Sequence, residues 1–168
     1  MASGDPVVQV LRVMPPGATS ATMDARAGGS TPAEAVIVYD FDAAAAEYMD
    51  FLCRLEGYDG GGITLTLPYS MSSATADDVI WTVAVRAMPD DAEDIDASHT
   101  YVYNSVTDTV PSASGELSYP TVAFTNGADM DSWADGELAI VRVSRDATNE
   151  SDTATGDAEL WGISGVES

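Results

Sequence analysis

Apolar and polar residues alternate along most of the chain, with a period of two that puts successive side chains on opposite faces of a β-strand. After three consecutive glycines, residues 63–67 read Ile-Thr-Leu-Thr-Leu, with the aliphatic side chains on one face and threonine on the other. Residues 48–55 alternate in the same way. The apolar face consists of Met49, Phe51, Cys53 and Leu55, and the mixed face consists of Tyr48, Asp50, Leu52 and Arg54. Both segments predict strands with one covered face.

Eight segments carry this pattern or are rich in β-branched and aromatic residues: 35–41, 48–55, 63–67, 79–87, 100–106, 116–125, 137–145 and 159–166. Turn-forming residues separate them, as in Pro-Ser-Ala-Ser-Gly at 111–115 and Asn-Gly-Ala-Asp at 126–129. Helical periodicity is almost absent. The sequence therefore predicts an all-β fold, an antiparallel jelly-roll β-sandwich of about eight strands.

The first 32 residues differ from the rest. An apolar segment, Val7 to Met14, is followed by Pro-Pro-Gly at 15–17 and Gly-Gly-Ser at 28–30, which tie it loosely to the remainder of the chain. One interpretation is an arm that pairs with the sheet edge of a neighbouring chain. The alternative is an ordinary first strand of the same domain. We divide the chain into an N-terminal arm, 1–32, and a jelly-roll domain, 33–168.

The segment 138–143 is apolar on both faces near its start, which indicates a strand covered from both sides. The cover is either a subunit interface or a long loop of the same chain, and both alternatives stay open. Combined with the proposed arm, this pattern predicts interface residues at Val8, Val10, Leu11, Val13, Leu138 and Ile140.

Charge narrows the choice of partners. The 168 residues include 28 acidic and six basic ones, giving a formal net charge of −22, and every basic residue is arginine. Such a surface repels phosphate, so we expect neither nucleic acid nor an anionic membrane as a partner. The acids are spread along the chain, which favours a solvated surface suited to high salt over a set of cation sites. The N-terminal residues lack a signal-peptide pattern, so no Sec-type export is expected.

The residues that usually carry catalysis are scarce. One cysteine, Cys53, excludes an intrachain disulfide, and the single histidine, His99, has no second histidine to complete a metal site. No nucleophile elbow, phosphate loop, dinucleotide fingerprint or zinc spacing occurs. Asp94, Asp96 and the acids of 126–131 have the spacing of calcium ligands, but turn formation explains them better. We expect no enzyme, no catalytic residue, no cofactor and no metal.

Several segments together resemble a known group of proteins. The pattern comprises residues 122–125, 128–131, 135–147 and 156–160, with 62–67 and 73–81 earlier in the chain. It resembles the small jelly-roll structural proteins of tailed phages and related archaeal viruses, found as capsid cement or decoration proteins and as fibre domains. The resemblance covers residues 33–166. It implies a trimer without catalytic groups, in which Arg142, Arg145 and Asp146 are structural or interface residues.

These observations support two functional hypotheses. The first is a virion structural protein, a cement or decoration protein on the capsid exterior, forming a homotrimer on the major capsid protein and bridging capsomers. The alternative is a carbohydrate- or receptor-binding module of a head or tail fibre. Its sugar-stacking rings would come from the tyrosines Tyr58, Tyr69, Tyr101, Tyr103 and Tyr119.

Overall fold

The computed structural model describes residues 3–168, which contain twelve β-strands and one short 3-10 helix, η1 (Ala128–Met130). The larger sheet has eight strands, in the order β8 (Tyr103–Thr109), β7 (Asp78–Met88), β10 (Leu138–Arg145), β4 (Glu47–Leu55), β1 (Pro6–Met14), β12 (Ser164–Glu167), β5 (Ile63–Thr66) and β9 (Thr121–Phe124). The smaller sheet has four, in the order β2 (Thr22–Ala27), β3 (Ala35–Phe41), β11 (Ala158–Leu160) and β6 (Tyr69–Met71).

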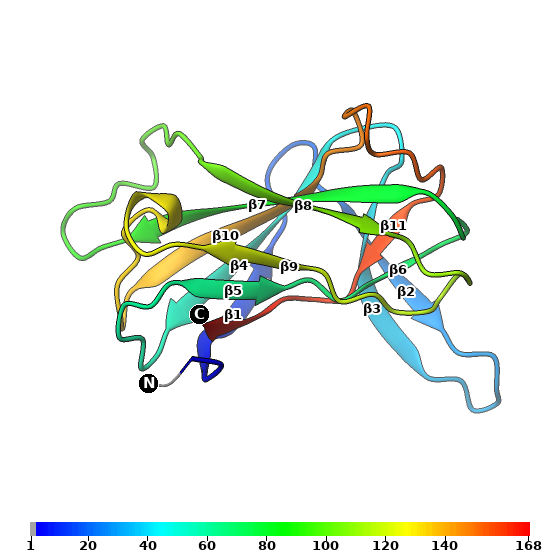
Figure 1. Ribbon diagram of the computed structural model, residues 1–168, viewed down its shortest axis with the longest axis horizontal. Coiled ribbons are helices and arrows are strands. Elements are labelled where there is room, and N and C mark those ends of the chain that lie inside the picture. The colour runs from blue at the N-terminus through cyan, green and yellow to red at the C-terminus, as the bar shows by residue number, and fades with distance from the viewer. Residues whose placement is uncertain (1–2) are drawn as a thin grey trace.

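Neighbouring strands in both sheets run antiparallel. The large sheet curls until its two edge strands approach each other, and the side-chain amide of Asn104 in β8 donates to the carbonyl of Ala123 in β9 at 2.8 Å. The small sheet lies at one end of the molecule, on the right in Figure 1, and closes that end. The predicted all-β antiparallel jelly roll is thereby confirmed, with more strands than the eight expected.

The core lies between the two sheets and inside the curl of the larger one. All the apolar residues predicted for the inner face of β4 are buried. Trp81 of the large sheet joins the layers, because Phe41 and Tyr69 of the small sheet both make edge contacts with its ring at centroid distances of 5.1 and 5.4 Å. Such aromatic contacts add to the free energy gained by burial alone.

The structure corrects the interpretation of residues 1–32 as an arm. Strand β1 is an interior strand of its own sheet, paired with β4 on one side and β12 on the other. Val7 is buried, and β2 pairs with β3 along its whole length. Releasing this segment would expose Val7 and leave the C-terminal strand without one of its partners. The segment is an ordinary first part of the domain over residues 3–32, and residues 1–2 lie outside the described part of the chain.

Within residues 3–168, no helix is long and apolar enough to cross a membrane.

Candidate ligand-binding groove

The outward-facing side chains of the large sheet form a row across four strands. Arg142 of β10 stands opposite Asp50 of β4 on one side and Ala84 of β7 on the other. Ala84 in turn stands opposite Tyr103 of β8. Paired residues point to the same face of a sheet, so the tyrosine, the arginine and the aspartate share one surface.

A cavity of about 240 Å³ opens on this surface beside the row. The pairings of Ser144 with Thr82 and with Tyr48 place two small side chains next to the aromatic one. We name this cavity the tyrosine groove, and its lining consists of Ala46, Tyr48, Thr82, Tyr103, Ser144 and Asp146. Small residues on the strands and larger rings from β4 and β8 therefore produce the hollow.

Arg142 is held in a fixed position beside the groove. Its guanidinium donates two hydrogen bonds of 2.7 Å to the carboxylate of Asp50. The guanidinium carbon lies 4.4 Å from the ring centroid of Tyr101 and 5.6 Å from that of Tyr48. These hydrogen bonds to Asp50 are the main reason that the pKa of Arg142 is raised, and a guanidinium over an aromatic ring is a favourable cation–π pair. The rings are therefore ordered before any ligand arrives.

The tyrosine hydroxyls beside the groove stay neutral, because burial raises the pKa of both Tyr101 and Tyr103 above its ordinary value. The two ring centroids are 6.0 Å apart. A neutral phenol both donates and accepts hydrogen bonds. The pair thus offers apolar faces together with two polar ends.

The segment 89–99 supports this aromatic cluster from outside. Arg86 is buried and donates to the Glu93 carboxylate at 2.6 Å and to the backbone carbonyl of Asp94 at 2.7 Å. His99 packs edge-on against the ring of Tyr101 with centroids 4.8 Å apart. The histidine is thus a polar loop residue that buttresses Tyr101.

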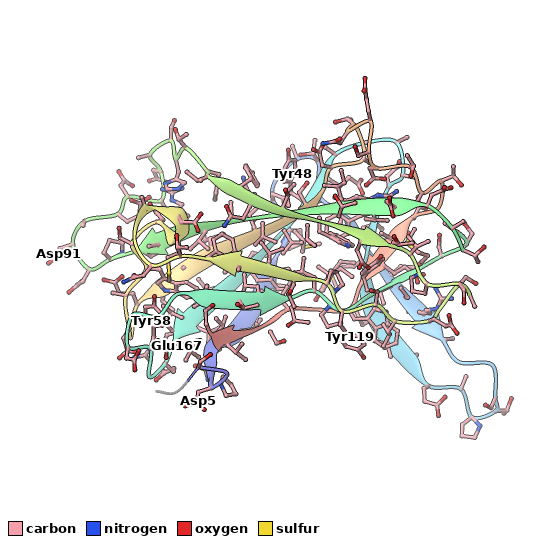
Figure 2. The ribbon with its side chains drawn as sticks, in the orientation of Figure 1. Asp5, Tyr48, Tyr58, Asp91, Tyr119 and Glu167 are labelled. Carbon is pink, nitrogen blue, oxygen red and sulfur yellow. The ribbon has the colours of Figure 1, made fainter. Side chains whose placement is uncertain are left out.

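The structure brings together two of the five tyrosines predicted as sugar platforms, Tyr101 and Tyr103. Tyr69 is fully buried in the core, where burial raises the pKa of its hydroxyl. Tyr58 is partly buried, and its hydroxyl accepts the backbone N–H of a glycine-rich turn at 3.0 Å. Tyr119 is 60% exposed and lies on the other side of the molecule from Tyr48 (Figure 2). Neither Tyr69 nor Tyr58 presents a free ring to solvent.

The sequence reasoning missed Tyr48 as a candidate ligand residue. The signal was present, since the alternation of 48–55 assigns Tyr48 to the same mixed face as Asp50. The register between strands, which places Ser144 and Arg142 beside them, has no counterpart in local sequence.

The six predicted interface residues lie on two strands of the large sheet, β1 and β10. Val8 and Val13 pack against the core, whereas Leu11 beside them is 47% exposed. On β10, Leu138 is exposed and Ile140 is partly buried, both on the outer face. Val10 is also exposed on β1. The exposed members are therefore divided between two strands that β4 separates.

The acids considered as calcium ligands serve the backbone. Asp94 accepts the N–H of Asp96, and Asp129 and Asp131 accept backbone N–H groups of neighbouring segments at 2.7 and 2.9 Å. The bonds of Asp94 and Asp129 are local and typical of turns, whereas Asp131 bonds to Ala87 of β7. Among the residues that the structure describes, no group of three potential ligands is placed to hold a metal ion.

No protein-family profile matches this chain, and no curated protein sequence matches it. Among solved structures, the chain is similar to the carbohydrate-binding module TmCBM61, solved in complex with beta-1,4-galactotriose. The two share 11% sequence identity with a TM-score of 0.40, over 94% of this chain and 88% of the other. The bound sugar belongs to that other protein, and the function of this chain has to be sought in its own side chains.

Proposed function

We propose that this protein is a carbohydrate-binding module and that the tyrosine groove receives a sugar ring of a glycan. One observation carries the proposal: two tyrosine side chains, Tyr48 and Tyr103, line a cavity whose remaining wall is made of small and polar residues. Ligand sites commonly combine aromatic walls with a few placed polar groups. Nothing in the groove resembles a catalytic constellation, so binding without turnover is the activity expected.

The chemistry of the groove suits a sugar. The C–H side of a sugar ring is apolar and stacks on aromatic rings, while its hydroxyls need donors and acceptors at the edge. Asp146 supplies a carboxylate, and Thr82 supplies a hydroxyl. Because the Asp50 ion pair holds Arg142 against Tyr48 and Tyr101, little side-chain entropy is lost on binding.

The test is calorimetric titration after screening on a glycan array. We expect Tyr103→Ala to weaken binding of the array hit by about tenfold or more, since truncating a central aromatic residue commonly costs that much. Tyr103 is 42% exposed, so the substitution leaves the core intact. Tyr119→Ala is the matched control, because it removes an exposed tyrosine far from the groove.

Equal affinity of the Tyr103→Ala and Tyr119→Ala proteins would contradict the assignment of the groove. An array without a single hit would contradict glycan binding altogether. Tyr48→Ala gives an independent check from the opposite wall, and its folding is verified by circular dichroism.

We propose capsid cementing as a second candidate function, supported by an apolar strip on the same face. Leu138 pairs with Met88, and Ile140 pairs with Leu52, all on the outer side of the sheet. A strip of this kind suits contact with a capsid subunit or with copies of this chain in a trimer. Leu138→Asp should then abolish co-sedimentation with viral shells while the protein stays folded. Unchanged co-sedimentation, or none by the parent protein, would contradict this function.

A further inference from the structure

A second cavity of about 210 Å³ lies beside the small sheet, whose strands are separate from those of the tyrosine groove. It is bordered by β2, β3 and the turns adjoining them. We name it the tryptophan cavity, and its lining consists of Arg26, Ala27, Gly28, Glu34, Val36, Gly115 and Trp161.

A chain of hydrogen bonds fixes the two largest lining side chains. The indole N–H of Trp161 donates to the hydroxyl of Ser70 at 3.0 Å, and that hydroxyl donates to Glu159 at 2.9 Å. Arg26 donates to the same carboxylate oxygen and forms an ion pair with it. Ser70 and Glu159 are buried. These hydrogen bonds restrict the rotation of both side chains, so the indole and the guanidinium are preorganised.

Two glycines keep the polar ends of the cavity uncovered. A Cβ atom at Gly115 would lie 2.7 Å from a terminal nitrogen of Arg26, and one at Gly28 would lie 2.8 Å from a carboxylate oxygen of Glu34. Gly115 also has a φ of 85°, which other residues rarely adopt. The cavity consequently contains a guanidinium, a carboxylate and an indole ring within one small space.

The charge balance of the cavity favours an uncharged ligand. Glu159 offsets the positive charge of Arg26, and Glu34 adds a negative charge that no other lining residue compensates. The whole chain carries a formal charge of −22. An anionic sugar would therefore be repelled. A neutral sugar can accept a hydrogen bond from Arg26, donate one to Glu34 and lay its C–H side on the indole.

We infer that the tryptophan cavity is a second carbohydrate-binding site, specific for uncharged sugar rings and independent of the tyrosine groove. It goes beyond the proposed function because it makes one chain bivalent. Two sites on different sheets engage two parts of a glycan at once, which raises the apparent affinity for polymers over that for single sugars.

Intrinsic fluorescence tests this site selectively. The chain has three tryptophans, and Trp81 and Trp133 are 0% and 1% exposed, so Trp161 is the one that a ligand or a quencher reaches. The probes are glucose, galactose, mannose and their neutral oligosaccharides, with galacturonic acid as the charged comparison. We expect at least one neutral probe to shift the emission saturably and to protect Trp161 from acrylamide.

Variants separate this site from the groove. Val36→Phe fills the cavity without removing the fluorophore and should weaken the fluorescence-detected affinity by about tenfold or more. Tyr103→Ala should leave the fluorescence-detected affinity for single sugars unchanged. If Val36→Phe fails to fold, Glu34→Gln serves instead. It should not disturb the fold, because Glu34 is exposed and outside the buried network. It keeps the shape of the cavity but removes the charged acceptor, so it should weaken binding several-fold.

Contrary results separate the two sites. If no sugar changes Trp161 fluorescence while calorimetry still detects binding that depends on Tyr103, the second site is overturned and the groove stands. A fluorescence response that survives both Val36→Phe and Glu34→Gln also overturns the second site. A response to galacturonic acid equal to that for neutral sugars overturns the specificity. If calorimetry finds no sugar binding that depends on Tyr103 while Trp161 fluorescence still responds, only the proposed function of the groove is overturned.

Discussion

The carboxylate of Asp50 and the guanidinium of Arg142 meet through two parallel hydrogen bonds of 2.7 Å across the pairing of β4 with β10. Asp50 is buried even though it points to the outer face of the sheet, because tyrosine rings lie over its partner. A two-pronged pair of this geometry is among the stronger hydrogen-bonded contacts in proteins. It both compensates a buried charge and fixes the wall of the tyrosine groove.

Replacing Asp50 by asparagine should therefore destabilise the fold and impair the groove. The amide keeps the shape but leaves the Arg142 charge without its counter-ion, so we expect the free energy of unfolding to fall by about 1–3 kcal/mol. Urea denaturation measures the change. Glu56→Gln is the control, because the Arg54–Glu56 pair at 3.2 Å is about half exposed and should contribute less than about 0.5 kcal/mol. Equal effects of the two substitutions would contradict the structural role of Asp50.

Arg145 provides a test of a fully buried ion pair. Its guanidinium donates twice to Asp152 and also to the backbone carbonyls of Ala154 and Gly156, which fixes the course of residues 152–156. Arg145→Met leaves the Asp152 carboxylate buried without a counter-ion and should lower the free energy of unfolding by about 3–5 kcal/mol. Urea or thermal denaturation measures the loss, with Arg54→Met as the exposed control. Near-parental stability would show that the pair is dispensable.

Strands that have one face covered by the core were predicted well in both sheets. The segment predicted at 35–41 coincides with β3, and that at 48–55 differs from β4 by one residue. In β4 the four apolar residues at alternate positions all fall in the core. Burial of one face is the physical cause of the period of two, so the sequence carries it directly.

The other three strands of the small sheet, β2, β6 and β11, were harder to predict than β3, because they are short or exposed. β2 has mostly exposed residues, so no apolar alternation marks it. β6 has three residues, all buried, and directly follows Pro68. The segment predicted at 159–166 is two strands, β11 and β12, in different sheets, with Gly162 between them at a φ of 151°. Alternation cannot report a strand that leaves one sheet and enters another.

The groove depends on the register between neighbouring strands, and this register is not encoded in any short segment of the sequence. Asp50 and Arg142 are 92 positions apart, and their pairing depends on how β4 and β10 align. The proline- and glycine-rich stretches around β1 misled the domain assignment for a related reason. Such residues mark turns inside a domain and flexible tethers equally well. Only the pairing of β1 with β4 and β12 distinguishes the two.

Cys53 should be chemically inert in the folded protein. Its side chain is fully buried in the core, and burial raises the pKa of the thiol to about 12. The thiolate is the reactive species, so labelling by a disulfide reagent near pH 8 should require unfolding. Mass spectrometry of the labelled protein measures this, with labelling in urea as the positive control. Rapid labelling of the native protein would contradict the burial of Cys53.

Asp40 has an unfavourable environment for a charged carboxylate. Burial, followed by the negative charges of Asp157, Glu159, Asp24 and Glu47, raises its pKa from 3.8 to about 6. The buried oxygen Oδ1 has no hydrogen-bond partner among the described residues. The native state therefore binds the Asp40 proton more tightly than the unfolded chain does.

A raised carboxyl pKa makes the folded state less stable at neutral pH than at mildly acidic pH. Above about pH 6 the charged form carries the whole cost, and this cost disappears as the pH falls toward about 4, where the native carboxyl is protonated. Asp40→Asn should thus stabilise the protein by about 1 kcal/mol near pH 7.5, after allowance for solvent screening, and by almost nothing near pH 4. Urea denaturation at both pH values measures the difference, and Asp90→Asn in an exposed loop serves as the control. A benefit of Asp40→Asn that is equal at the two pH values would instead indicate that the amide stabilises the site through a new hydrogen bond.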